Sequence, residues 1–508
     1  MNRGRKVAGR GLAQLAEDFG YQLPASLVSE PAAKAASVFT SIARRRGRMG
    51  QMLGWTAVPL SLPTYRMTSD EVGGVWPFIT ASGLAPTGAM MGLDYLSGGA
   101  FYADPLGWVL DPDMPVTNGN VMIFGKPGQG KSGTVKTFCL RMMPYGYRVL
   151  ILGDPKDEYE KLCRALGVEP IVFGHGQWAR INVLDYGPLR HGWQSLSRQE
   201  QVTRTQTTFA RWLRLIAGLV GSQKIGNEHV PFGPNEGAVI TEVLSHLTGR
   251  NSGNSDLRET TIPQVWHALN NPTDELIAAG RHRDRHQFFD RTELLRNTLA
   301  TLVYGHLAGL FDAPTNVEID WRAPIQSLSL SRISPLGDEA IGIALMCLNS
   351  WGTGMRAIAE PGDLRIVVRD EAWRQMRLGV EAVKALDADL RLSRGGTGAG
   401  ADVQIVAAHK PSDLLSVGSA GSQEVAIARD MMHLCDTKIL LGQDEEVGAE
   451  LGSSLGLPAM GQDIVTRWAM ARTGRALWMV GTRLFKVASI LTRTERDLTW
   501  TNDALAKA

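Results

Sequence analysis

The chain has 508 residues and a formal net charge of only +2, so its bulk charge does not mark it as a protein that binds polyanions over its whole surface. Hydrophobic residues make up 44% and charged residues 20%, which is typical of a globular protein long enough for more than one domain. Four widely spaced cysteines without a CxxC pair argue against a disulfide framework or a structural zinc site. The sequence has neither a run of about 18 apolar residues nor an apolar signal segment, so we expect a cytoplasmic protein with no integral membrane segment of its own.

The first part of the chain predicts two regions that precede the main fold. Residues 1–50 form a basic N-terminal arm with arginine clusters near each end, which suits either a solvated leader or contact with anionic lipid or nucleic acid. Residues 51–116 are rich in Gly, Pro and Thr and predict a short strand and loop lead-in region. Within it we expect residues 101–105 and 107–111 to form short strands and turns.

From Asn120 onward, short apolar runs alternate with helical segments, which is typical of a parallel α/β sheet. The expected strands are 121–124, 148–153, 170–173, 325–330, 364–368, 403–407 and 438–441, followed by a hairpin of 476–480 and 485–490. The expected helices among them are 131–143, 157–166 and 338–358. Residues 195–306 interrupt this alternation and look mainly helical. We therefore predict a core of residues 117–194 and 307–492, a helical insertion of 195–306 and a C-terminal tail of 493–508.

A glycine-rich loop gives the strongest chemical signal in the chain. Residues 125–132 read GKPGQGKS and match G-x-x-x-x-G-K-[ST] in full, between an expected strand and an expected helix. Its glycines let the backbone N–H groups turn toward phosphate oxygens, and the following helix directs its positive dipole end at the same anion. Lys131 is then expected to bridge the β- and γ-phosphates of ATP, and the Ser132 hydroxyl to ligate Mg²⁺. The expected nucleotide-binding residues are Gly125, Lys126, Pro127, Gly128, Gln129, Gly130, Lys131, Ser132 and Gly133.

A second group of candidates follows the apolar strand at 364–368. Asp370 and Glu371 come at the carboxyl end of this strand, where ligand sites of α/β sheets form. Asp370 would hold Mg²⁺ and Glu371 would polarise the attacking water. The alternative is a pair of acids that caps the next helix. Arg369, directly before the pair, is unusual in an apolar strand and suits either a neighbouring subunit or a local ion pair.

Several segments resemble one branch of the P-loop ATPases. Residues 154–159 read DPKDEY and resemble the D-P-K-G-E-Y pattern of the HerA–FtsK branch, and residues 370–373 read DEAW, similar to conjugation and type IV secretion ATPases of the VirB/TraC kind. Segments 309–315, 437–441, 474–478 and 494–499 are also similar, in the same order. The resemblance spans about residues 115–500. It implies an α/β fold with a RecA-like P-loop NTPase sheet and a mainly helical insertion, a homohexameric working form, and a place at the cytoplasmic face of a transfer channel.

The chain also departs from the pattern of that family. Members usually carry a large N-terminal domain, and here only a short region precedes the core, so that domain is either absent or supplied by another chain. His409 stands where the family often has a Gln that senses the γ-phosphate. The imidazole could replace that sensor or serve a structural role. Arg391 and Arg394, before the glycine-rich 395–400, are the candidates for an arginine that acts on the next subunit's ATP; ordinary solvated arginines are the alternative.

These observations leave three functions open. The first is an ATP-hydrolysing motor of a conjugative or type IV secretion system, peripheral at the inner face of the membrane, with channel proteins as partners. The second is a DNA translocase or coupling protein of the same superfamily, which would bind DNA directly. The third is a nucleotide-binding scaffold that does not hydrolyse ATP. A small-molecule kinase is disfavoured because no substrate pocket or lid is identifiable in the sequence.

Overall fold

The computed structural model describes residues 84 to 500, apart from 85, 227, 253–255, 306, 312, 318–319, 321, 355–357, 361, 394–400 and 420. The predicted basic arm at 1–50, residues 51–83 of the lead-in region and the candidate Arg394 lie outside the described residues.

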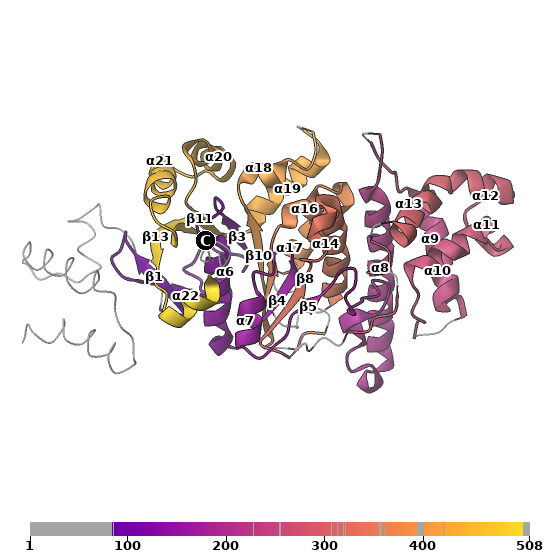
Figure 1. Cartoon of the computed structure of the whole chain (residues 1–508), viewed down its shortest axis with the longest axis horizontal. Coiled ribbons are helices and arrows are strands. Elements are labelled where there is room, and N and C mark those ends of the chain that lie inside the picture. Colours follow the sequence, from indigo (N-terminus) through magenta and orange to yellow (C-terminus); the bar gives the residue numbers. More distant parts are fainter. Residues whose placement is uncertain are drawn as a thin grey trace, which may run out of the picture. The chain divides into compact units, whose positions relative to one another are not determined.

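An 11-stranded sheet forms the centre of the described fold, in the order β2-β1-β13-β12-β11-β3-β10-β9-β4-β8-β5 (Figure 1). The strands from β11 to β5 run parallel to one another, and the remaining four extend the sheet in antiparallel fashion. The strands are β1 Ala89–Asp94, β2 Ala100–Ala103, β3 Val121–Phe124, β4 Tyr147–Asp154, β5 Ile171–Val172, β8 Ile325–Ser329, β9 Leu364–Arg369, β10 Ala401–Ala408, β11 Thr437–Leu441, β12 Arg475–Val480 and β13 Arg483–Ser489. The alternating pattern and the closing hairpin predicted from the sequence are confirmed.

Helices cover both faces of this sheet because its central strands are buried on both sides. In β3, Val121 and Ile123 belong to one core, and Met122 and Phe124 belong to the other. Side chains of successive strand residues point to opposite faces, so four apolar residues in a row serve two cores. The covering helices are α6 Lys131–Met142, α7 Glu160–Ala165, α14 Asp338–Gly352, α16 Ala372–Met376, α17 Val380–Leu392, α18 Pro411–Leu415, α19 Gln423–Leu434, α20 Glu445–Leu455, α21 Ala459–Asp463 and α22 Arg493–Thr499.

Three expected elements differ from the structure. The strands and turns predicted at 107–111 are wrong: Pro105–Leu110 is helix α5, because the Asp104 side chain accepts from the Gly107 N–H at 3.1 Å and Pro105 suits a first helical turn. Helix α7 begins at Glu160 and not at residue 157, since the preceding residues wrap around a buried carboxylate. Helix α14 ends at Gly352, before the predicted end at residue 358, because two glycines flank Thr353 and lower the helix propensity there. Residues 355–357 of the predicted helix lie outside the described residues.

The segment between β5 and β8 contributes a group of helices whose apolar core is continuous with residues of β4, β8 and α14. They are α8 Arg198–Ser222, α9 Pro234–Thr248, α10 Ile262–Asn270, α11 Asp274–Ala279, α12 Arg285–Arg291 and α13 Glu293–Tyr304, with a short hairpin of β6 Lys224–Ile225 and β7 Glu228–His229. Helix α8 packs on α14 and α17, and Figure 1 shows α9 to α13 beyond α8, away from the sheet. The boundaries of the insertion at 195 and 306 stay predictions.

Polar contacts join the insertion to α14. Arg211 of α8 is buried and donates to the Ser350 carbonyl at 3.4 Å and to the Asp185 carbonyl. The neighbouring Trp351 donates its indole N–H to the Asp185 carboxylate at 2.9 Å. These groups lie away from water, so each bond also removes the cost of an unsatisfied buried polar atom.

Candidate active site

The glycine-rich loop leaves β3 at Gly125 and enters α6 at Lys131. Gly128 and Gly130 have φ angles of 84° and 93°, a left-handed conformation that other residues adopt only at a cost. A side chain at Gly130 would also meet Thr473 at 3.0 Å. The Thr134 N–H donates to the Gly130 carbonyl at 2.8 Å and closes the first helical turn. The earlier N–H groups of that turn have no helical partner of their own, which suits an anion.

The rest of the loop is held by neighbouring segments. Lys126 makes an exposed ion pair with Asp444 at 2.9 Å. The Gly474 N–H donates to the Gln129 carbonyl at 3.4 Å, from the turn that precedes β12. Pro127 lies within the loop, and Ser132 and Gly133 open α6 directly after Lys131. The predicted nucleotide-binding residues therefore form one continuous turn between strand and helix.

The order of the strands brings the acidic pair to this loop. Only β10 separates β9 from β3, and all three are parallel. Their carboxyl ends consequently meet at one edge, with the loop after Phe124, His409 after β10, and Asp370 and Glu371 after β9. The positive charge of Lys131 acts on both carboxylates. The sheet thus brings together Lys131, Asp370, Glu371 and His409.

Asp370 is buried, and its surroundings are acidic. Burial raises the pKa of its carboxyl group to about 7; the charge of Lys131 opposes this shift, while Glu158, Glu371 and Asp154 add to it. A cation close to Asp370 would offset this excess of negative charge. Within the described ranges no three His, Cys, Asp or Glu side chains could hold a metal by themselves. Mg²⁺ that travels with a nucleotide needs only one or two protein oxygens besides the phosphates, so Ser132 and Asp370 fit that ion.

Glu371 is the most constrained side chain of the site. Its φ of 56° is left-handed, and its side chain is 3% exposed. One carboxylate oxygen accepts from Lys156 Nζ and the other from the Trp373 indole N–H, both at 2.6 Å. Burial alone would raise the pKa of Glu371, but the hydrogen bond and charge of Lys156, together with Lys131 and Arg374, outweigh burial and lower the pKa. Glu371 is therefore an ionised acceptor at neutral pH.

The turn after β4 places Lys156 beside Glu371. The buried Asp154 carboxylate accepts from the backbone N–H groups of Lys156, Glu158 and Tyr159 at 3.2, 3.0 and 2.9 Å. Since β4 pairs with β9, this turn lies next to the acidic pair. The DPKDEY segment was recognised in the sequence, but neither the contact of Lys156 nor that of Trp373 was predicted. The sequence signal was a lysine directly after a buried strand at the sheet's ligand edge.

His409 lies against the lysine of the loop. Its Nδ1 atom is 3.2 Å from Lys131 Nζ. Because an ammonium can only donate, Nδ1 accepts and the proton of the neutral ring sits on Nε2. Burial, followed by the charge of Lys131, lowers the pKa of His409. The ring is thus neutral at pH 7 and keeps one N–H that can donate.

The two predicted arginines that the structure describes, Arg369 and Arg391, lie in different surroundings. Arg369 is buried and forms a local ion pair with Asp389 at 2.8 Å, and it also donates to Gln404 and to Asn349. It does not point to a neighbouring subunit. Arg391 is exposed and pairs with Asp387 at 2.7 Å on its own helix.

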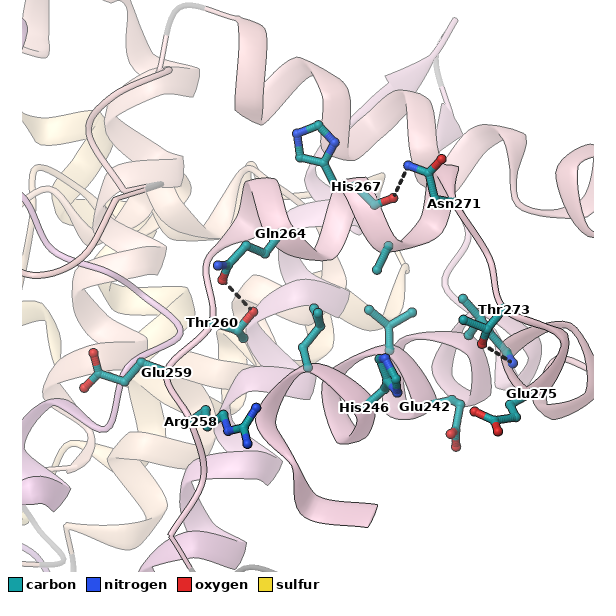
Figure 2. A pocket seen from close by; sticks show the side chains of 14 residues that line it. Glu242, His246, Arg258, Glu259, Thr260, Gln264, His267, Asn271, Thr273 and Glu275 are labelled. Carbon is teal, nitrogen blue, oxygen red and sulfur yellow. Dashed lines mark hydrogen bonds between the residues drawn. The ribbon is translucent and has the colours of Figure 1, made fainter. Parts of the chain in front are cut away.

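A separate pocket lies in the helical insertion. It has a volume of about 560 Å³ and lies between α9, α10, α11 and the segment before α10 (Figure 2). Its rim is polar and mixed in charge, with Glu242 and His246 on α9 and Gln264 on α10. None of the predicted nucleotide-binding residues lines it. We therefore do not assign it to the nucleotide.

Comparisons with known proteins agree with this architecture. No family model and no curated protein matches the sequence. VirB4 of Thermoanaerobacter pseudethanolicus has a similar structure, with a TM-score of 0.60 and 22% identity over 82% of this chain and 100% of that one. The plasmid coupling protein TrwB in complex with ADP and Mg²⁺ is similar with a TM-score of 0.50 and 12% identity, over 84% and 95% of the two chains. The predicted RecA-like P-loop fold is confirmed. The resemblance to conjugation and type IV secretion ATPases is confirmed as a resemblance in fold.

In the part of the chain that the structure describes, every helix is too short or too polar to cross a lipid bilayer.

Proposed function

We propose that this protein is an ATP-hydrolysing motor of a conjugative or type IV secretion system. The observation that carries the proposal is the meeting of Lys131, Asp370, Glu371 and His409 at one edge of a sheet of the VirB4 type. A loop with the full phosphate-binding pattern after β3, and two acids after β9 with only β10 between the two strands, is the arrangement that phosphoryl transfer to water requires.

Each residue has a distinct part in this chemistry. Lys131 and the N–H groups around Gly130 neutralise and orient the β- and γ-phosphates of ATP. Ser132 and Asp370 would hold Mg²⁺, which supplies further positive charge to the phosphate oxygens when it is bound. Glu371, ionised and rigid, accepts a hydrogen bond from the attacking water and directs it. The Nε2–H of His409 is the donor that senses the γ-phosphate.

The motor works as a homohexamer in this proposal, peripheral at the cytoplasmic face of the membrane with channel proteins as its partners. An arginine from the neighbouring subunit would complete the site, because a guanidinium stabilises the charge that spreads over the transferring phosphoryl group. Arg391 and Arg394 are the candidates. The ion pair of Arg391 with Asp387 is exposed, and such pairs are weak, so Arg391 can exchange its carboxylate for a phosphate.

A coupling protein or DNA translocase is the second candidate, favoured by the likeness to TrwB. It differs from the first in one measurable respect, since its ATP turnover would rise with DNA and this rise would weaken steeply with salt. A scaffold that does not hydrolyse ATP gains no support from the unusual position of Arg369 in an apolar strand, because the ion pair with Asp389 accounts for that position.

The test is phosphate release by the purified full chain with ATP and Mg²⁺. We expect turnover that falls at least about 100-fold in Lys131→Ala, because the main cation on the phosphates is lost. Lys224→Ala, on the exposed hairpin of the insertion, is the control. In donor cells the same loop variant should abolish transfer. Transfer by Lys131→Ala at the wild-type level would refute the motor.

A further inference from the structure

The contacts of Glu371 come from two elements that are separate in the sequence. Lys156 belongs to the turn after β4, and Trp373 to helix α16. Each donates to a different oxygen of the carboxylate at 2.6 Å. Arg374 approaches the second oxygen at 3.8 Å. Both oxygens of the carboxylate are therefore held by hydrogen bonds.

The backbone of Glu371 does not fix this geometry by itself. A left-handed φ of 56° at a residue other than glycine is a strained conformation, which persists only where the surroundings enforce it. Lys156 is itself fixed at its backbone by the buried Asp154 carboxylate. The Trp373 ring is held from its face by Arg377, whose guanidinium is 4.3 Å from the ring centroid. Both donors thus have supports of their own.

The two lysines of the site approach from different strands. Lys131 follows β3, two strands to one side of β9, and Lys156 follows β4, the neighbour on the other side. Lys131 contacts His409 and, in the proposed function, binds the phosphates. The Lys156 side chain is 48% exposed, while the Glu371 side chain it contacts is 3% exposed. Lys156 consequently contacts the acid from the solvent-exposed side of the site.

We propose that Lys156 is a positioning residue for ATP hydrolysis, which with Trp373 clamps the Glu371 carboxylate in the orientation that directs the attacking water. This inference rests on the proposed function and adds to it a residue of the DPKDEY segment. Without Lys156, a buried carboxylate loses the ammonium that contacts it at 2.6 Å, which is strongly unfavourable. The carboxylate then turns outward or changes its partners, and it no longer orients the attacking water.

The experiment separates binding from chemistry in the purified full chain. Turnover is measured under saturating ATP and Mg²⁺, and affinity is measured with a fluorescent non-hydrolysable ATP analogue. We expect Lys156→Ala and Lys156→Met to lower kcat by about 10- to 100-fold, as loss of a supporting partner typically does, while the Kd of the analogue stays within about twofold. Lys156→Arg should restore most of kcat, and Trp373→Phe should cost less than Lys156→Ala.

The matched control is Lys384→Ala. It breaks a lysine–glutamate pair of similar length, 2.8 Å, in which the glutamate is exposed, and it should leave kcat unchanged. If the wild type hydrolyses ATP, Glu371→Gln does not, and Lys156→Ala behaves like Lys384→Ala, the positioning role is wrong and the proposed function stands. Equal losses in kcat and affinity, or no recovery in Lys156→Arg, would also overturn it. A wild type without turnover would refute the proposed function itself.

Discussion

The two halves of the candidate site are built in opposite ways. The phosphate loop is made of backbone: its shape comes from glycines at positive φ, and Lys126 and Lys131 extend from it toward solvent or toward His409. The acidic half is made of side chains that are buried and bonded, with Glu371 and Arg369 each held by partners from other elements. The loop presents backbone groups to which a ligand can bind, whereas the acidic side chains are fixed by contacts within the protein.

Because of this difference, we expect substitutions in the two halves to have different effects. A change in the loop removes binding, and chemistry with it. A change in the acidic half should leave the nucleotide bound and stop or slow its hydrolysis, or should weaken the fold itself. Four changes test this division, beginning with the largest expected effect.

Glu371→Gln should separate binding from chemistry most sharply. The amide keeps the size of the side chain but loses the charge that polarises water, and a positioned base contributes about 10²- to 10⁴-fold. We expect turnover to fall by that factor while an ATP analogue still binds. Phosphate release and the affinity for the ATP analogue, measured on the same variant, test this prediction. Loss of affinity together with turnover would mean that the acidic half also builds the binding site.

Arg369→Met should weaken the fold and not the binding loop. It leaves the buried Asp389 without this guanidinium, and breaking a buried ion pair costs about 3–5 kcal/mol. The urea midpoint of unfolding should fall accordingly. The exposed pair of Arg391 and Asp387 gives the comparison, since Arg391→Ala should shift the midpoint far less. Similar shifts in both variants would show that burial does not matter here.

The pH dependence of binding should report Asp370. Because burial raises its pKa to about 7, the carboxylate that Mg²⁺ requires is mostly present at pH 8 and mostly protonated at pH 6. We expect the affinity for Mg·ATP to fall about tenfold between these values. Titration with a fluorescent analogue at a series of pH values measures it, and Asp370→Asn should flatten the profile and bind more weakly throughout.

The stability of the ligand-free chain supplies the control for Asp370. A carboxyl group whose pKa is raised on folding adds stability below its ordinary pKa of 3.8, and this stability is lost as pH rises through about 7. Asp370→Asn should therefore raise the melting temperature at pH 8 and leave it nearly unchanged at pH 4. A lower melting temperature at pH 8 would contradict the burial argument.

His409→Ala should have the smallest effect of the four. In the proposed function the ring offers one N–H to the γ-phosphate, and one hydrogen bond contributes about 1 kcal/mol, or roughly fivefold in rate. His409→Gln, which also places a donor there, should recover part of it. Phosphate release at saturating ATP is the measurement. A loss in His409→Gln as large as in Glu371→Gln would move His409 into the group that performs the chemistry.

The sequence predicted one half of the site far better than the other, for a physical reason. The loop depends on residues that are adjacent in the chain, so Gly125 to Ser132 could be recognised directly. The strands also could be predicted, because β3 and β9 are apolar runs of ordinary length. Lys156 and Trp373 could not be placed, since their contact depends on β4 pairing with β9. Helix α5 was missed because a single cap at Asp104 outweighed residues with strand propensity.

Helix α14 has a consequence that reaches beyond the site. Three consecutive residues near its end, Asn349, Ser350 and Trp351, bond in turn to Arg369 beside the acidic pair, to Arg211 of the insertion, and to Asp185. A helix is stiff along its axis, so α14 couples the position of the acidic pair to that of the helical insertion. Any displacement of β9 at its carboxyl end must therefore either stretch these buried bonds or move the helical insertion with it.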